Sequence, residues 1–322
     1  MTLSRRARLE AAVSRAVGAA SSAMARASAI PGLRPAAAVL GTALVVAVSW
    51  RAWVTTDLDG VPVAAMLGVA VAAFPAVLAV NSAEFRLQAE LAGVRLGAVE
   101  TVRFVSQANV ANMLPLPGGP VVRLRVLARR GASQRLGVRI QLLTAVWWLA
   151  SGLMVSGLAL AVAADGPWLG ALAGAAALVL GVAGWGMRPR SAPHPSHLGW
   201  LAVVELCSVI VGAARLWAIA VLLGATLDAA GAMSMAFTTP AAAALGIFPS
   251  GIGAREALVA ATAELIGADA AVMFLAATLE RVMSLIAAVP LLVWSLWERR
   301  HPKADSAMAV AAPNQRGDEQ PA

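Results

Sequence analysis

Long apolar stretches separated by short charged clusters dominate this sequence of 322 residues. A helix needs about 20 consecutive apolar residues to cross a bilayer, and six stretches reach or approach that length. The predicted spans are 36–54, 61–83, 140–164, 168–187, 198–224 and 270–297. Charged residues make up 13% of the chain, against roughly 25% in soluble domains. We therefore predict an all-α fold, a polytopic membrane helix bundle.

The two ends of the chain differ in composition from its apolar middle. Residues 1–35 carry six arginines against a single acid, Glu10, and we interpret them as a basic cytoplasmic extension. Residues 36–300 form the predicted integral membrane domain. Residues 301–322 are polar, Ala/Pro-rich and aperiodic, which is typical of a disordered cytoplasmic tail.

Loop charges predict the orientation of the spans. Arginines cluster at the N-terminus, in 123–139, in the 188–197 linker and in 299–303, whereas the connections between these clusters are acidic. Because Lys and Arg are enriched in cytoplasmic loops, both termini are expected in the cytoplasm. Basic residues are almost all Arg, with Lys303 the one lysine, which is typical of bacteria with G+C-rich genomes. We expect the bacterial inner (cytoplasmic) membrane.

Several functional classes are disfavoured by the sequence. The formal net charge is +8, but no basic face with interleaved aromatics indicates nucleic-acid binding. Cys207 is the single cysteine, so a cysteine-based metal site and an internal disulfide are not expected. The sequence has no phosphate-binding loop of the ATPase type and no nucleophile elbow. We therefore expect no enzymatic activity and no cofactor or metal, and we expect that ATP does not drive any transport by this protein.

Two segments interrupt the apolar pattern with proline and glycine. Segments 109–123 and 245–256 share the spacing Pro-x-x-x-Gly, from Pro115 to Gly119 and from Pro249 to Gly253. Proline breaks helix continuity, and broken backbone persists in a membrane only where protein or a water-filled cavity satisfies it. Ordinary loops between helices would also explain each segment alone.

The position of the two breaks favours a more specific hypothesis. Three predicted spans separate them, so two re-entrant broken-helix hairpins would enter from opposite sides, as weak inverted repeats. Discontinuous helices at corresponding positions of inverted halves indicate a transporter binding site. The helix N-termini after Gly119 and Gly253 would aim unpaired N–H groups at an anion such as a lipid phosphate.

Ionisable residues near the second break and in the last span are the next indication. Arg255-Glu256 and Glu264 follow the second break, and Glu280-Arg281 lies near the middle of span 270–297. Glu205 and Arg215 lie in span 198–224. Each such residue costs about 2.5–3.5 kcal/mol to insert into a membrane. They are expected to face a polar cavity, to neutralise one another as interhelical pairs, or both. Residues 84–104, with alternating charges, are predicted to form a solvated interfacial helix.

The motifs at the breaks resemble the transmembrane, flippase-like region of the lysylphosphatidylglycerol synthase family, over roughly residues 36–300. Its first motif, Pro-Gly-x-x-Gly-Glu-x-x-Arg, corresponds here to Pro115, Gly119 and Arg123. Its second motif, Pro-x-Gly-x-Gly-x-x-Glu, and the Glu-Arg pair that follows it correspond to Pro249, Gly251, Gly253, Glu256 and the pair Glu280-Arg281.

The chain also departs from the family pattern. Pro120 replaces the glutamate of the first motif, and Val146-Trp147-Trp148 stands where a first-half Glu-Arg pair often lies. The first half is therefore depleted in charge. The soluble aminoacyl-transfer domain of the full-length synthases is also missing from this sequence, so lysyl transfer is not expected.

The resemblance implies translocation or binding of a lipid whose anionic or zwitterionic headgroup sits in a central polar cavity. Arg255, Arg281 and Arg123 would contact phosphate, since a guanidinium bonds phosphate in bidentate fashion. Glu256 and Glu280 would hold those arginines or meet a cationic part of the headgroup. Transport would be passive or coupled to an ion gradient. The alternative is a non-transporting membrane subunit that scaffolds or presents lipid to a partner glycosyltransferase or lipid-modifying enzyme.

Overall fold

The computed structural model of the chain describes residues 63–112, 118–163, 167–189, 196–245 and 253–300, with the single residues 47, 50 and 54. All regular structure within these ranges is helical, which confirms the predicted all-α class for this part of the chain. The helices are α3 (Val63–Leu91), α4 (Ala98–Ala111), α5 (Gly118–Arg129), α6 (Gln134–Ala163), α7 (Pro167–Gly186), α8 (Ser196–Leu222), α9 (Ala229–Met233), α10 (Thr238–Leu245), α11 (Ala254–Leu265) and α12 (Ala270–Arg300).

Four of these helices, α3, α6, α7 and α8, are long and apolar enough to cross a membrane. They cover the predicted spans 61–83, 140–164, 168–187 and 198–224. Their outer faces expose large apolar side chains, such as Val162 at 80% and Leu178 at 70% exposure. A belt of this kind would be unfavourable against water and is suited to lipid. The chain is a membrane-embedded helix bundle.

The two remaining predicted spans have different outcomes. The predicted span 36–54 lies outside the described residues apart from isolated positions, as do the predicted terminal segments 1–35 and 301–322. The predicted span 270–297 corresponds to α12, which is one helix of 31 residues. It is not among the four membrane-length apolar helices, and it carries the pair Glu280-Arg281 near its middle.

The structure corrects the prediction of a solvated helix over 84–104. Helix α3 continues to Leu91, and its residue Glu84 is buried. The local charge pattern gave no sign of this because the partner that neutralises Glu84 is Arg123 on α5, 39 residues away. A new helix, α4, begins only at Ala98.

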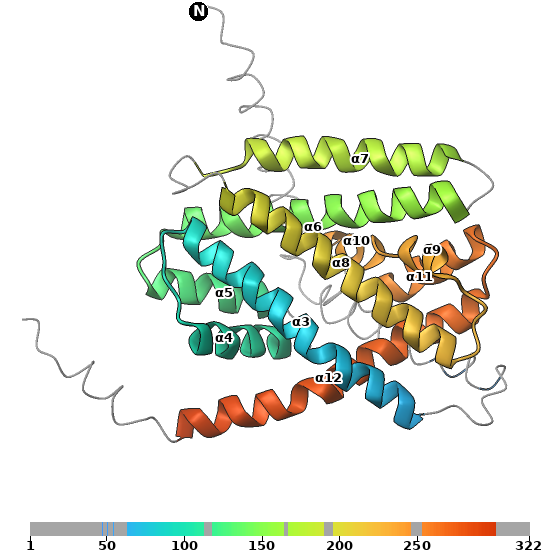
Figure 1. The fold of residues 1–322 in the computed structure, drawn as a ribbon. Helices are drawn as coiled ribbons and strands as arrows, with labels where there is room; N and C mark the ends of the chain where they lie inside the picture. Colours follow the sequence, from blue (N-terminus) through green and yellow to red (C-terminus); the bar gives the residue numbers. More distant parts are fainter. Residues whose placement is uncertain are drawn as a thin grey trace, which may run out of the picture.

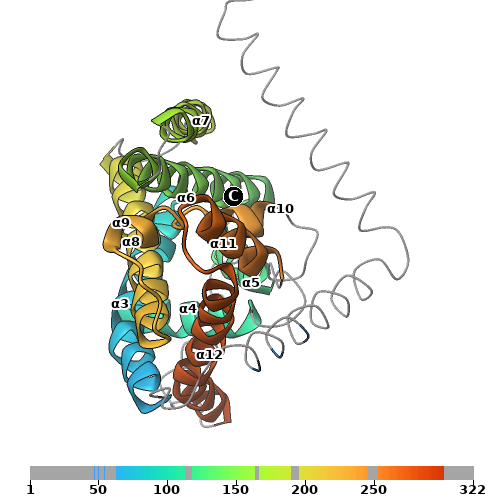
Figure 2. The same ribbon diagram turned by 90° about the vertical axis from the view of Figure 1, so that its right-hand side faces the viewer.

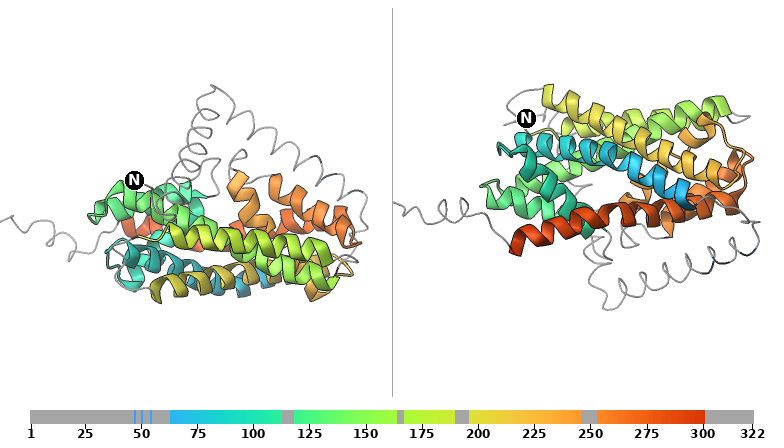
Figure 3. Two further views of the ribbon diagram at one scale, coloured as in Figure 1. Left: turned by 90° about the horizontal axis from the view of Figure 1, so that it is seen from above. Right: turned by 60° about the horizontal axis from the view of Figure 1, so that its bottom comes forward.

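Helices α3 and α8 lie side by side along one face of the bundle, as Figures 1 and 3 show from different directions. Each contributes to two separate buried apolar clusters. One cluster, which includes Phe85 and Leu143, joins α3 and α8 to α4, α5 and α6. The other, which includes Val259 and Met273, joins them to α11 and α12. Helices beside each of the two breaks thus pack into a different apolar core.

Short helices flank both breaks. Helices α4 and α5 pack against each other across residues 113–117, and α10 and α11 pack against each other across residues 246–252. Both intervening segments lie outside the described residues. Each pair also contacts a long helix that lies far from it in the sequence: α4 packs on α12, and α10 packs on α6. Each pair of short helices therefore packs on a long helix of the other part of the chain.

Helix α7 lies at the edge of the bundle and packs on α6, as Figure 2 shows. Glycines bring the two backbones together. A Cβ added at Gly170 of α7 would lie 2.6 Å from the carbonyl oxygen of Gly157 and 2.8 Å from the Cβ of Ala161, both on α6. A Cβ added at Gly174, one turn further along α7, would meet no atom within 4 Å.

We therefore expect Gly170→Ala to separate α6 from α7 and to lower the free energy of unfolding by about 1–3 kcal/mol, the usual effect of overpacking. The matched control, Gly174→Ala, should be neutral or slightly stabilising, because alanine restricts the unfolded chain more than glycine does. Unfolding in detergent, followed by circular dichroism, measures both. Equal stability of the two variants would contradict this account of the α6–α7 contact.

Candidate functional site

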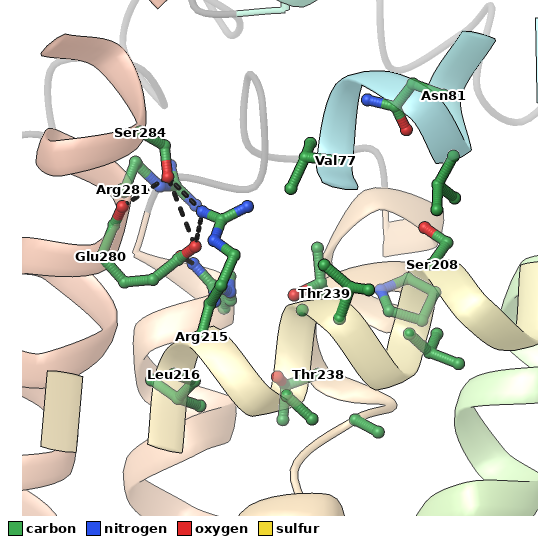
Figure 4. A pocket seen from close by; sticks show the side chains of 18 of the residues that line it. Val77, Asn81, Ser208, Arg215, Leu216, Thr238, Thr239, Glu280, Arg281 and Ser284 are labelled. Atoms are coloured by element: carbon green, nitrogen blue, oxygen red, sulfur yellow. Dashed lines mark hydrogen bonds and ion pairs between the residues drawn. The ribbon is translucent and has the colours of Figure 1, made fainter. Parts of the chain in front are cut away.

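A cavity of about 410 Å³ lies between α3, α4, α8, α12 and the helices around the second break. Most of its lining is apolar, including Phe74, Val77 and Leu216. Figure 4 shows Arg215, Glu280, Arg281 and Ser284 gathered at one end and Asn81 and Ser208 at the other. The cavity therefore has one charged end and one polar, uncharged end.

Glu280 is the centre of the charged end. Its Oε2 accepts a hydrogen bond from Nη1 of Arg255 at 2.6 Å, and its Oε1 accepts one from Nη2 of Arg215. Ser284, one turn further along α12, accepts a second bond from Arg215 and donates to the Glu280 carbonyl at 2.6 Å. The side chains of Arg255 and Glu280 are 9% and 7% exposed, so both charges are removed from water.

The three charged residues come from three different helices. Arg215 lies on α8, Arg255 is the second residue of α11, and Glu280 lies within α12. Because a buried guanidinium is costly without a partner, the shared carboxylate fixes the positions of these helices relative to one another. Two arginines on one glutamate leave this trio a formal charge of +1.

Glu256 has two separate functions in the structure. Its Oε2 accepts a hydrogen bond from the backbone N–H of Gly253 at 2.8 Å, which caps the N-terminus of α11. Its Oε1 forms an ion pair with Nε of Arg281 at 3.2 Å. Gly253 has a φ of +83°, a left-handed backbone conformation that favours glycine. The spacing Gly253-x-x-Glu256 is thus explained by helix capping.

The first break is capped in a similar way. Gly119 is buried at the start of α5, and its N–H donates to Oδ1 of Asn112 at 2.9 Å. The expectation that the N–H groups of the helix N-termini after Gly119 and Gly253 point at an anion remains a prediction, but the N–H groups of the two glycines themselves are paired. Side-chain oxygens inside the protein already accept from both, so these two groups are not available to an anion.

Arg123 lies apart from the other predicted arginines. It forms a buried ion pair with Glu84 of α3, and its guanidinium stands 5.7 Å from the centre of the Phe85 ring. It is not among the residues that line the cavity. The expectation that Arg123 would join Arg255 and Arg281 around one phosphate is not met in this structure, since Glu84 holds it elsewhere.

The structure brings together four of the predicted site residues: Arg255, Glu256, Glu280 and Arg281. Gly119 and Gly253 stand at the N-termini of α5 and α11, and Arg123 is placed with Glu84. Three predicted residues, Pro115, Pro249 and Gly251, lie outside the described residues.

Sequence reasoning left out Arg215, Ser284 and Asn81 from the site. An arginine inside a predicted span is by itself an indication of function, so Arg215 could have been included. Ser284 and Asn81 carry no charge, and nothing in the sequence distinguishes them from other polar residues of the spans.

Comparison with models of known protein families and with curated proteins finds no match to this chain. The family resemblance stated above therefore depends on the motif residues alone.

Removal of the shared carboxylate gives the clearest test of this cluster. We expect Glu280→Gln to lower the free energy of unfolding by about 3–5 kcal/mol, because two buried guanidinium groups lose their counter-charge. The control is Arg86→Gln on α3, whose side chain is 61% exposed and pairs with Glu90 one turn away. Its effect should stay below about 0.5 kcal/mol. Denaturant unfolding in detergent compares the two, and equal effects would contradict a stabilising role of Glu280.

Proposed function

We propose that this protein binds the anionic part of a lipid headgroup at the charged end of the cavity and moves the lipid between membrane leaflets without ATP. The observation that carries the proposal is the sharing of Glu280 by Arg215 and Arg255. The trio holds an excess positive charge inside a membrane-embedded bundle. An anion bound there would offset that charge.

The chemistry of the arginines favours a phosphate. A guanidinium presents a planar fork of donors that matches phosphate oxygens, and charge-assisted bonds of this kind are about twice as strong as neutral ones. Arg215, Arg255 and Arg281 all line the same cavity. Glu280 and Glu256 orient them, so the donors are held in position before the ligand arrives.

The surroundings favour a lipid over a soluble anion. The cavity wall is mostly apolar, with side chains from α3 and α8 such as Phe74, Val77 and Leu216. A lipid would place its phosphate on the arginines and its apolar part along this wall. A pocket of apolar lining with a few convergent polar groups is the usual form of a ligand site.

The architecture supports a transporter of inverted repeats. Helices α4, α5, α10 and α11 have 14, 12, 8 and 12 residues, which is too short to cross a bilayer. We propose about six full spans with two re-entrant hairpins, α4–α5 and α10–α11, and both termini in the cytoplasm of a bacterial inner membrane. The exchanged contacts of α4 with α12 and of α10 with α6 support a two-fold relation.

The same features support the proposed relation to the flippase-like region of the lysylphosphatidylglycerol synthase family. Gly119 of the first motif and Gly253 of the second stand at helix N-termini beside the breaks. The glutamate of the second motif, Glu256, contacts the arginine of the Glu280-Arg281 pair. The second motif and the Glu-Arg pair of the resemblance, which are separate in the sequence, thus contact each other in one site.

A second candidate is a membrane subunit that presents lipid to a partner glycosyltransferase or lipid-modifying enzyme. The observation that favours it is the position of Arg123, which pairs with Glu84 and does not line the cavity. The charges that line the cavity then come from the second half of the chain only. A lipid bound at one end need not cross to the other leaflet.

Fluorescent-lipid movement in proteoliposomes tests the proposal, with an anionic and a zwitterionic phospholipid compared. We expect wild-type protein to move lipid and Arg255→Gln to slow the movement about tenfold or more, since a hydrogen bond to a charged group contributes about 1.5–3 kcal/mol. Arg255→Lys should also be impaired, because lysine keeps the charge and loses the fork. Arg86→Gln is the matched control and should behave as wild type.

The outcomes separate the two candidates. Folding of each variant is checked by size exclusion and thermal unfolding in detergent. Absence of movement by folded wild type for both lipids would exclude an autonomous transporter. Retained binding of the anionic lipid, lost in Arg255→Gln, would then favour the partner subunit.

A further inference from the structure

A second buried charged group lies at the other half of the bundle, around Glu205 of α8. The residue is 2% exposed. Its Oε1 is buried and has no hydrogen-bond partner in the described part of the chain. A buried carboxylate oxygen without a hydrogen-bond donor is costly when the group is ionised. The ionised form of Glu205 is therefore unfavourable at this position.

Among the described residues, Glu84 of α3 and Arg123 of α5 lie close enough to Glu205 for their charges to act on it. Arg123 donates to both oxygens of Glu84, and Gln88 donates to Glu84 Oε1 at 2.7 Å. The single arginine is therefore already bound to another carboxylate. Two carboxylates with one guanidinium give this trio a formal charge of −1, the opposite of the Arg215–Glu280–Arg255 trio.

The polar groups that form hydrogen bonds with Gln88, beside this trio, include two uncharged side chains of α6. On α6, Thr144 and Gln141 form hydrogen bonds with Gln88 of α3, at 3.1 and 2.8 Å. Helix α9, which also packs on α8, has no titratable residue. The mid-helix charges of α12, Glu280 and Arg281, lie with the cavity arginines. At the start of α8, His197 is 3.2 Å from Glu90, two turns before Glu205.

The acidic trio lies next to the cavity. Asn81 lines the cavity from α3 and Ser208 lines it from α8. Glu84 follows Asn81 by one helical turn, and Glu205 precedes Ser208 by one turn. Figure 4 shows Asn81 and Ser208 at the end of the cavity away from Glu280 and Arg281. The Arg215–Glu280–Arg255 trio therefore lines one end of the cavity, and the acidic trio lies about one helical turn beyond the lining of the other end.

We propose that Glu205 carries one exchangeable proton and that its protonation is coupled to occupancy of the cavity by an anion. The proton comes from water, forms an O–H bond on the Glu205 carboxyl group, and returns to water when that bond breaks. With the proton bound, the Glu84–Arg123–Glu205 trio is neutral. The coupling is reciprocal, as linkage requires: a proton favours the anion, and the anion favours the proton.

Proton binding at Glu205 would supply energy for lipid transport, and this part of the inference rests on the proposed function. A lipid phosphate that enters with a proton would be driven by the proton gradient across the membrane. The presence of a proton on Glu205 does not depend on what the cargo is. The proton on Glu205 and the movement of lipid can therefore be measured separately.

Infrared spectroscopy of the purified protein measures the proton directly. A protonated carboxyl group gives a carbonyl stretching band that shifts in deuterium oxide. We expect a band that disappears as the pH is raised, and that is missing from Glu205→Gln. The control is Glu100→Gln, which removes a partly exposed carboxylate bound to Arg130 and should leave the band intact. Absence of the band from wild type at all pH values, or its persistence in Glu205→Gln, would overturn the proposal.

A second measurement needs no variant. Dicyclohexylcarbodiimide modifies protonated carboxyl groups in apolar surroundings, and peptide mass spectrometry locates the modified residue. We expect modification of Glu205 that decreases at alkaline pH. Modification confined to other residues would overturn the proposal, even if Glu205→Gln failed to fold.

Lipid movement in proteoliposomes then tests the coupling. Movement by wild type should change with an imposed pH gradient, whereas Glu205→Gln should move lipid without that dependence. If both proteins respond equally to the gradient, the coupling is refuted. If wild type moves no lipid but the infrared band titrates and is lost in Glu205→Gln, the proposed transport fails and the proton on Glu205 is upheld.

Discussion

Burial of charge in an apolar environment is the constraint on which this structure depends. Glu280 binds Arg215 of α8 and Arg255 of α11 from its place on α12. Neither arginine could remain in the bundle at moderate cost without this carboxylate. The same interaction joins the second broken helix pair to two long helices, and it leaves an excess positive charge beside the cavity. Stability and the proposed binding of an anion thus have one origin.

Each half of the bundle contains a cluster of three charged side chains with a net charge, and the net charges of the two clusters are opposite. In one half two arginines share a glutamate, and in the other an arginine is placed among two glutamates, Glu84 and Glu205. Helices α3 and α8 pass through both halves and contribute to both apolar cores. A change in charge at one trio can therefore act on the other through two continuous helices and the cavity between them. The proposed exchange of a proton at one trio and of an anion at the other would use this arrangement.

The long helices were predictable from sequence, and the pairing of charges was predictable only in part. Hydropathy identified the helices now seen as α3, α6, α7 and α8, because membrane-length apolar stretches leave few alternatives. Proline and glycine located the two breaks, and in-span charges identified Arg255, Glu256, Glu280 and Arg281. The partner of Arg123 was missed, because Glu84 lies 39 residues away in a stretch whose alternating charges are typical of a solvated helix. The capping of Gly119 and Gly253 was also missed, since it depends on where the side chains of Asn112, before the first break, and Glu256, inside α11, come to lie.

The most direct test of the central claim is an experimental structure of the protein in nanodiscs that contain an anionic phospholipid, obtained by electron cryo-microscopy with a bound antibody fragment. We expect density for a phosphate within hydrogen-bond distance of Arg215 and Arg255, with the apolar part of the lipid along Phe74 and Val77. A cavity that contains no phosphate, with both arginines bound to Glu280 alone and every headgroup at the membrane surface, would contradict the assignment of this cluster as a headgroup site.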